Sequence, residues 1–325
     1  MANNFLSAGY YAGNQVIIHW AEERKWLRFR DPLEVFLASD PKEVVPILGH
    51  IEKEVETKKI YAAGFVAYEA GLAFDPALCF RAVGDFPLLW FGLFREAEPF
   101  TVPAVGGPPA TLGAALPARR SCASGAAGGR AGPPVWSPAW QSSVTEQEYK
   151  KAIQTVKSLI VEGATYQVNY SYRLRAPFDG DALSYFLQVA GRQNIPYAAF
   201  VGTDRYAICS FSPELFFNLR GGVISSKPMK GTMPRGIFNA DDEAVARALY
   251  LSEKNRAENV MIVDMVRNDI GRIAAPGTVA VPAMFDLEKY DTLWQMTSTV
   301  SARTSASLFQ IFQALFPPAS CTGAP

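Results

Sequence analysis

AICSFSPELFFNLRGGVISSKPMKGT, residues 207–232, contains two apolar stretches that are joined by a pair of glycines and followed by a proline. The pair Gly221 and Gly222 is typical of a tight turn between antiparallel strands. Pro228 ends the second stretch because proline has no backbone N–H to donate to a neighbouring strand. We therefore expect a β-hairpin here.

The hairpin predicts that a carboxylate and an amine meet at one of its ends. If the two glycines form a two-residue loop, the register carries Glu214 opposite Met229, beside Lys230. If a three-residue loop begins at Gly221, Glu214 pairs with Lys230 directly. The two side chains converge in both registers.

The composition describes a folded protein with balanced charge. The 325 residues are 49% hydrophobic, which is ample for a core, and 31 basic residues match 31 acidic ones. This balance favours a small-molecule substrate over nucleic acid or a membrane surface. No apolar run approaches the roughly 20 residues of a membrane helix, and the N-terminus lacks the pattern of a leader, so we expect a cytoplasmic protein. Four cysteines without a CxxC pair, with only two histidines, argue against zinc and disulfides.

Three regions differ in composition. Residues 1–100 mix helical stretches with short apolar strands and indicate an N-terminal α+β region. Residues 101–140 are rich in Ala, Gly and Pro and predict a flexible linker. Residues 141–325 form the third region, which begins with an amphipathic helix whose capping box pairs Thr145 with Glu148.

Two further elements are expected in the third region. YQVNYSYRL, residues 166–174, alternates with a period of two and predicts a half-buried strand. Residues 241–269 predict one long helix, and its stretch VMIVDMV indicates burial on nearly every side. Because Asp264 lies inside that stretch and Arg267, Asn268 and Asp269 follow it, we expect these four residues in a structural network at the end of the helix.

Six segments, in their order along the chain, make the sequence similar to the chorismate-binding enzymes, the family of anthranilate, aminodeoxychorismate and isochorismate synthases. The segments are YQVNYSYR, SFSPELFF, KPMKGTMPRG, AENVMIVDMVRNDIGRI, YDTLWQMTSTV and LFPPASCTGAP. The resemblance implies an α+β fold in which two antiparallel β-sheets pack face to face with helices outside. Family members continue beyond TGAP, so we expect this fold to be incomplete at the C-terminus.

The segment PMKGT resembles the aminodeoxychorismate synthase branch, which typically carries Lys where anthranilate synthases carry a small residue. The resemblance implies that Lys230 attacks C2 of chorismate and that ammonia then resolves the adduct at C4. It implies Glu214 as the general acid and base for the departing C4 hydroxyl. By the same resemblance, the protein is expected to be a transferase of the transaminase type, whose product, 4-amino-4-deoxychorismate, would serve 4-aminobenzoate and folate synthesis.

The resemblance also implies substrate contacts and partners. The residues expected to bind substrate are Gly231, Thr232, Thr322 and Gly323. Glu258 matches one of two carboxylates that hold Mg²⁺, although it also stands one turn after Lys254, where an ordinary ion pair is the alternative. A glutamine amidotransferase subunit is expected to supply the ammonia.

Two alternatives to this function stay open. An anthranilate or isochorismate synthase is one, although Gln295 stands where anthranilate-type sites carry His, which favours the aminodeoxychorismate branch. The other is a non-catalytic truncated fragment, because in the family the C-terminal part supplies the second Mg²⁺ carboxylate and groups for the substrate carboxylates. We therefore expect little or no activity from this chain alone.

Overall fold

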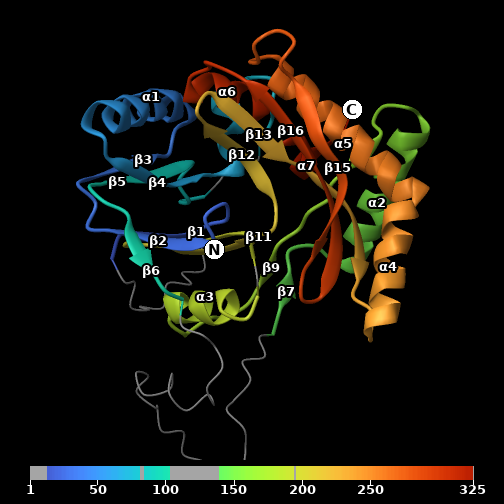
Figure 1. The fold of residues 1–325 in the computed structure, drawn as a ribbon. Helices are drawn as coiled ribbons and strands as arrows, with labels where there is room; N and C mark the ends of the chain where they lie inside the picture. Colours follow the sequence, from blue (N-terminus) through green and yellow to red (C-terminus); the bar gives the residue numbers. More distant parts are fainter. Residues whose placement is uncertain (1–12, 81–83, 103–138, 194, 325) are drawn as a thin grey trace, which may run out of the picture.

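The computed structural model describes residues 13–80, 84–102, 139–193 and 195–324. Within these residues all strand pairings are antiparallel, and helices lie outside the sheets (Figure 1). This arrangement confirms the predicted α+β class with antiparallel sheets. The linker predicted at residues 101–140 falls almost wholly outside the described residues and stays a prediction.

The first large sheet joins strands from both sides of that segment. Its order is β11 (Ala207–Ser212), β10 (Tyr197–Gly202), β1 (Gln15–Trp20), β2 (Lys25–Arg30) and β6 (Glu98–Phe100). β1 pairs with β10, with Gln15 opposite Gly202. The residues before and after the segment therefore satisfy each other's backbone hydrogen bonds.

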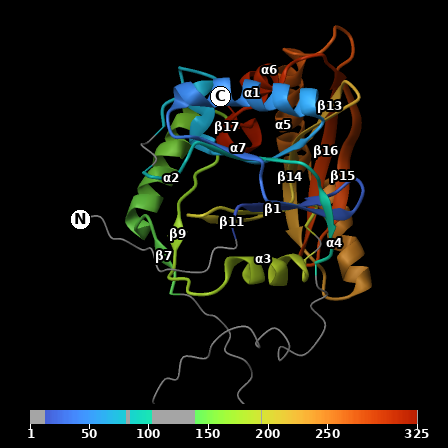
Figure 2. The same ribbon diagram turned by 90° about the vertical axis from the view of Figure 1, so that its left-hand side faces the viewer.

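Further layers cover both faces of this sheet. α3 (Ala182–Ala190) packs on one face through Phe186, which is fully buried. A three-stranded sheet lies on the other face, and Trp90 is among the side chains packed between the two sheets. Its strands are, in order, β3 (Glu34–Ala38), β5 (Leu89–Phe94) and β4 (Tyr61–Val66). α1 (Pro41–Lys58) closes this stack at the end opposite α3, as Figure 2 shows.

The second large sheet is organised around β16 (Leu293–Arg303). Its other strands are β12 (Leu215–Arg220), β13 (Val223–Lys227), β14 (Met229–Pro234) and β15 (Ala280–Lys289). β13 and β14 lie end to end along one edge of β16, and β15 lies along the other edge. Pro228 separates β13 from β14, and its carbonyl accepts a hydrogen bond of 3.1 Å from the Ser298 N–H.

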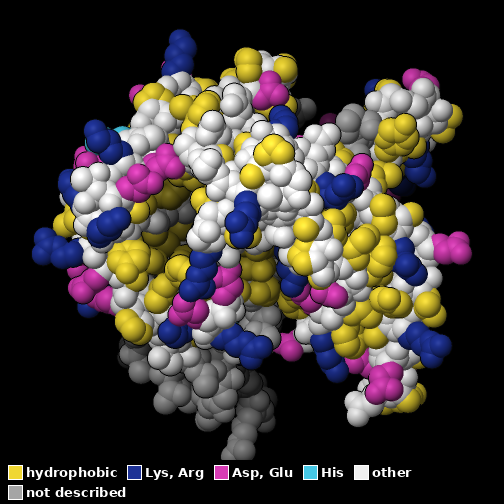
Figure 3. All heavy atoms as spheres, turned by 45° about the horizontal axis from the view of Figure 1, so that its top comes forward, with side chains coloured by type: hydrophobic (Ala, Val, Ile, Leu, Met, Phe, Trp, Pro, Cys, Tyr) yellow, Lys and Arg dark blue, Asp and Glu magenta, His cyan; other side chains and the backbone are white. Residues whose placement is uncertain are grey.

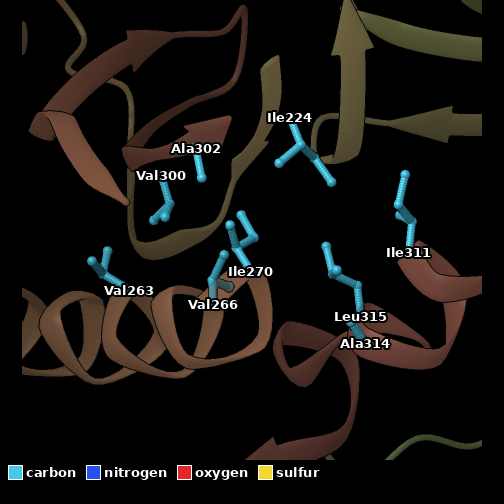
Figure 4. Close-up of a cluster of buried hydrophobic side chains, with 9 residues drawn as sticks. All are labelled: Ile224, Val263, Val266, Ile270, Val300, Ala302, Ile311, Ala314 and Leu315. Carbon is cyan, nitrogen blue, oxygen red and sulfur yellow. The ribbon is translucent and has the colours of Figure 1, made fainter. Parts of the chain in front are cut away.

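One face of α5 (Glu253–Gly271) packs on this sheet. The cluster in Figure 4 joins residues of α5, the sheet and α6 (Leu308–Leu315), and its buried members are Ile224, Val263, Val266, Ile270, Val300, Ala302, Ile311, Ala314 and Leu315. The expected burial of α5 on nearly every side is wrong, since Val260 and Met261 are exposed. The sheet and α6 cover only one face of the helix, the face that carries Val263, Val266 and Ile270 at intervals of three to four positions.

The single long helix expected at residues 241–269 is also wrong. The chain forms α4 (Asn239–Leu251) and α5, because Ser252 leaves the helical conformation and its side chain caps the start of α5. In place of the expected four-residue network, Asp264 and Arg267 form an exposed ion pair of 3.0 Å, and Asp269 pairs at 3.4 Å with Arg272, which also donates to the Ala314 carbonyl.

The segment that follows the amphipathic helix is less regular than its sequence predicts. α2 (Glu146–Val161) has the predicted capping box between Thr145 and Glu148. The strand expected at residues 166–174 is wrong, because only two short pieces pair with other strands. These are β8 (Gln167–Val168), which pairs with β17 (Gly323–Ala324), and β9 (Leu174–Arg175), which pairs with β7 (Gln141–Ser142).

The surface carries charges of both signs. On the face shown in Figure 3, Lys and Arg side chains alternate with Asp and Glu, in keeping with the net charge of zero. Among the described residues, no helix combines the length and apolar character that crossing a bilayer requires.

Candidate active site

The predicted hairpin forms, and its loop has two residues. Gly221 and Gly222 have φ values of +58° and +73°, and Arg220 pairs with Val223. Glycine takes these positive φ values without steric cost, which explains the turn. The three-residue alternative is therefore wrong.

An irregularity in β12 changes the register near Glu214. An unbroken ladder from the turn would place Leu215 opposite Pro228, but the register shifts between Leu215 and Asn218, and Leu215 pairs with Lys227. The prediction of Glu214 directly opposite Met229 did not include this bulge. The carboxylate of Glu214 nevertheless accepts a hydrogen bond from the Met229 backbone N–H.

Glu214 and Lys230 are close enough for their charges to interact. Burial raises the pKa of Glu214 above its ordinary value, while hydrogen bonds from the Ser320 side chain and the Met229 backbone and the charge of Lys230 oppose the rise. A carboxyl group with a raised pKa keeps its proton to higher pH, as a general acid must. Glu214 and Lys230 thus lie near each other, and the charge of Lys230 is the smallest of these influences on the carboxyl group.

Lys230 lies on a bulge of β14. Met229 pairs with Thr297, but Thr232 pairs with Gln295, so β14 contains one extra residue between these two pairs. Gly231 takes up the distortion with a φ of +101°. The predicted substrate-binding residues Gly231 and Thr232 follow the lysine directly. The Thr232 hydroxyl donates a 2.7 Å hydrogen bond to the Gln295 side chain.

Thr322 ends the short helix α7 (Ala319–Thr322), and Gly323 begins β17, close to the hairpin. Gly323 pairs with Val168 and has a φ of +130°, and a Cβ added there would lie 2.2 Å from the Gln167 carbonyl oxygen. α7 precedes this glycine and contains Ser320, whose hydrogen-bonding influence opposes the raised pKa of Glu214. The structure thus connects the segment of Thr322 and Gly323 to the Glu214–Lys230 pair.

A small cavity lies beside Glu214. Its volume is about 160 Å³, and its lining includes Glu214, Ser226, Asp269, Ser320 and Cys321. Pockets for small molecules usually measure about 300–1,000 Å³, so this cavity is smaller than a typical complete ligand site. A larger, open depression of about 770 Å³ elsewhere on the surface includes neither Glu214 nor Lys230.

Glu258 lies on α5 and forms the ion pair with Lys254 that was the alternative to a Mg²⁺ role. Its carboxylate is 3.7 Å from the Lys254 ammonium group, and its side chain is 42% exposed. Within the described residues no three His, Cys, Asp or Glu side chains gather as a metal site would require. One carboxylate still fits Mg²⁺, which often takes one or two protein carboxylates and completes its shell with substrate and water. The Mg²⁺ role of Glu258 stays a prediction.

The sequence patterns did not single out two of the residues that contact this site. Ser320 lies in the segment LFPPASCTGAP, where only Thr322 and Gly323 were selected. Asn259 donates a hydrogen bond of 3.2 Å to the Lys230 carbonyl oxygen and is fully buried. Its signal in the sequence was a polar amide directly before an apolar stretch, which requires a hydrogen-bond partner when buried.

The family model for chorismate binding enzymes matches residues 13–325, so the chain belongs to that family. It is 40% identical over 189 residues to aminodeoxychorismate synthase component 1 of Klebsiella aerogenes, and 39% identical over 188 residues to the protein of that name from Escherichia coli K12. These matches cover 58% and 57% of this chain but 42% of each relative, so the chain matches less than half of their length.

Solved structures share the fold over nearly all of the chain. Anthranilate synthase component I from Streptococcus pneumoniae superposes with a TM-score of 0.70 at 17% identity, covering 100% of this chain and 77% of that one. The menaquinone-specific isochorismate synthase of Escherichia coli gives a TM-score of 0.63 at 14% identity, covering 99% and 73%. At these identities the likeness establishes the fold alone.

Proposed function

We propose that this chain carries the catalytic lysine and acid of an aminodeoxychorismate synthase, which converts chorismate and ammonia to 4-amino-4-deoxychorismate for 4-aminobenzoate and folate synthesis in the cytoplasm. The observation that carries the proposal is that buried Glu214, at the start of β12, and Lys230, on the bulge of β14, lie near each other at the end of the hairpin. The relatives named aminodeoxychorismate synthase component 1 support this choice within the family.

The proposed reaction uses the two side chains in sequence. The neutral Lys230 amine forms a bond to C2 of chorismate, the ring double bonds shift, and the C4 hydroxyl leaves as water with a proton from Glu214. Ammonia then adds at C4, the double bonds shift back, and the bond from C2 to Lys230 breaks. The sum is chorismate plus ammonia giving 4-amino-4-deoxychorismate plus water. When glutamine supplies the ammonia, the overall reaction transfers an amino group from glutamine to chorismate, which corresponds to a transaminase-type transferase.

The other groups have supporting roles in this proposal. The backbone at Gly231 and Gly323 and the hydroxyls of Thr232 and Thr322 contact the substrate. Glu258 would hold Mg²⁺, which neutralises charge on a substrate carboxylate when bound. The relatives are named component 1, which supports the existence of a partner subunit. We propose that this partner is a glutamine amidotransferase that supplies ammonia.

Product analysis tests the proposal. This chain, completed to the length of its relatives and supplied with chorismate, Mg²⁺ and an ammonium salt, should form 4-amino-4-deoxychorismate, whereas the 325-residue chain alone should form little or none. In the completed protein, Lys230→Ala should lower the rate by at least about 100-fold. Lys150→Ala is the matched control, since that lysine lies on α2 with its side chain 69% exposed and pairs with Glu146, to which no role is assigned.

Other outcomes identify the alternatives. Anthranilate or isochorismate as product, with activity retained in Lys230→Ala, would contradict the proposed lysine chemistry. Failure of chorismate to bind in a calorimetric titration with Mg²⁺ would favour the non-catalytic fragment.

A further inference from the structure

The bulge that carries Lys230 is held by side chains rather than by regular strand pairing alone. One extra residue lies between the pairs Met229–Thr297 and Thr232–Gln295, so the ladder of β14 with β16 is interrupted at Lys230 and Gly231. An interrupted ladder leaves backbone groups that need other partners. Two amide side chains, one from α5 and one from β16, supply those partners.

Asn259 holds the carbonyl of Lys230. Its Nδ2 donates to the Lys230 oxygen at 3.2 Å, while its Oδ1 accepts from the Ser298 hydroxyl at 2.6 Å. The Ser298 oxygen accepts in turn from the Phe285 N–H at 3.1 Å. Asn259 and Ser298 are both 0% exposed, so solvent cannot replace these bonds without opening the contact between α5 and the sheet.

Gln295 holds the next two residues. Its Nε2 donates to the Gly231 oxygen at 3.0 Å, and its Oε1 accepts from the Thr232 hydroxyl at 2.7 Å. Gln295 is 7% exposed. Three consecutive residues, Lys230 to Thr232, are therefore each bonded to one of two buried amides.

The space around the bulge is equally restricted. A Cβ added at Gly231 would lie 3.1 Å from the Cβ of Asn255 and 3.3 Å from the Cβ of Met296. α5 on one side and β16 on the other thus leave room only for the backbone at this position. The direction in which the Lys230 side chain leaves the strand depends on this shape, because a one-residue shift reverses which face a strand residue takes.

We infer that Asn259, supported by Ser298, and Gln295 are positioning residues that hold the Lys230 bulge so that its amine meets Glu214 and the substrate. This inference rests on the proposed role of Lys230 as the nucleophile. It assigns a purpose to two buried amides on different elements, whose hydrogen bonds go to backbone carbonyls and hydroxyl groups around the bulge. We call Asn259, Ser298 and Gln295 together the clamp. Because displacement of a reacting group by about 1 Å can lower a rate by about 100-fold, loss of the clamp should lower the rate of the chemical step more than it weakens substrate binding.

The first measurement requires no enzyme activity. Competitive acetylation with acetic anhydride, followed by peptide mass spectrometry, gives the reactivity of Lys230 relative to the exposed Lys254. We expect Asn259→Ala and Gln295→Leu to raise the relative labelling of Lys230 by at least about threefold, because the amine leaves Glu214 for solvent. Asn268→Ala on the exposed side of α5 and Gln313→Leu on the exposed side of α6 are matched controls and should leave it unchanged.

Milder variants keep the test decisive if Asn259→Ala fails to fold. Ser298→Ala removes one hydroxyl and should give an intermediate increase in labelling, while Ser298→Thr keeps the donor and should restore the wild-type value. Wild-type labelling in every clamp variant, with thermal unfolding midpoints that show a folded chain, would overturn the inference.

The second measurement uses the substrate. With chorismate, the maximum rate of adduct formation on Lys230 should fall by about 10- to 100-fold in Asn259→Ala, while the half-saturating chorismate concentration stays within about twofold. An equal rate in the variant and the wild type would contradict the clamp. Absence of the adduct in the wild type would instead contradict the proposed function, and the labelling result would still decide the clamp.

Discussion

Ser320 in α7 and Glu214 at the start of β12 line the same cavity, and the hydrogen-bonding influence of the Ser320 side chain lowers the pKa of the Glu214 carboxyl group. The two residues are more than a hundred positions apart in the sequence. The influence of Ser320 stabilises the charged form of Glu214, whereas burial favours the neutral form. The pKa of Glu214 therefore depends on α7, a segment that no local sequence pattern connects to Glu214.

Removing the Ser320 hydroxyl should raise the pKa of Glu214 further. Ser320→Ala takes away a hydrogen bond to the carboxylate and leaves the burial that opposes ionisation. Infrared difference titration of the carboxyl band, with Glu214→Gln identifying the signal, measures the effect. Ser320→Thr keeps the hydroxyl and should behave like the wild type. A lower pKa in Ser320→Ala would contradict the described hydrogen bond.

Glu214 should also make stability depend on pH. Because its pKa is higher in the folded than in the unfolded state, its favourable contribution is present below the unfolded value and is lost as the pH rises through the folded value. Glu214→Gln removes this dependence, so the variant should gain stability relative to the wild type as the pH rises. Urea unfolding at pH 4 and at pH 8 measures the difference. A variant that loses relative stability at the higher pH would refute the expected sign.

Gly231→Ala should destabilise the fold by about 1–3 kcal/mol, because the added Cβ meets Asn255 and Met296 at a positive φ. The matched control is Gly49→Ala in α1, where a Cβ meets nothing within 4 Å and alanine should stabilise by up to about 1 kcal/mol. Urea unfolding of both variants gives the two free energies. Equal effects of the two substitutions would show that the bulge is not sterically restricted.

Asp242 should contribute to resistance against acid. Arg235 pairs with its carboxylate through two hydrogen bonds of 2.7 Å and, with further bonds from Gly236 and Trp294, holds the pKa of Asp242 well below its usual range. Stability from a lowered pKa is present above the unfolded value and is lost as the pH falls. Asp242→Asn should therefore have a lower free energy of unfolding than the wild type at pH 7, and the difference between the two free energies should narrow toward pH 2. A difference that widens in acid would contradict this assignment.

Sequence patterns predicted the local features of the fold well. The glycine pair at 221 and 222 requires positive φ values, and Thr145 with Glu148 satisfies the first N–H groups of a helix, so both signals are complete within a few residues. Ser252 carried a similar capping signal, which the continuous helical periodicity around it concealed. Such features depend on short-range geometry and can be recognised without the rest of the chain.

The bulges and the irregular segment after α2 depend on distant partners. The register shift at Lys230 depends on amides from α5 and β16, and the short β8 depends on pairing with Gly323. The alternation of residues 166–174 predicted a strand because periodicity does not reveal whether a partner strand lies alongside. The site residues Glu214 and Lys230 were predicted together because the hairpin is local, whereas Ser320 and Asn259 reach them only through the tertiary fold.

Intact-mass and peptide-mapping mass spectrometry of the protein after incubation with chorismate and Mg²⁺, without ammonia, tests the central claim most directly. The account predicts a mass increase of one chorismate minus one water, located on Lys230 and absent from Lys230→Ala, and Glu214→Gln should slow its formation by about 100-fold or more. The measurement requires a single addition per chain and no turnover. An adduct on another residue, or none on Lys230 while chorismate binds, would contradict the account.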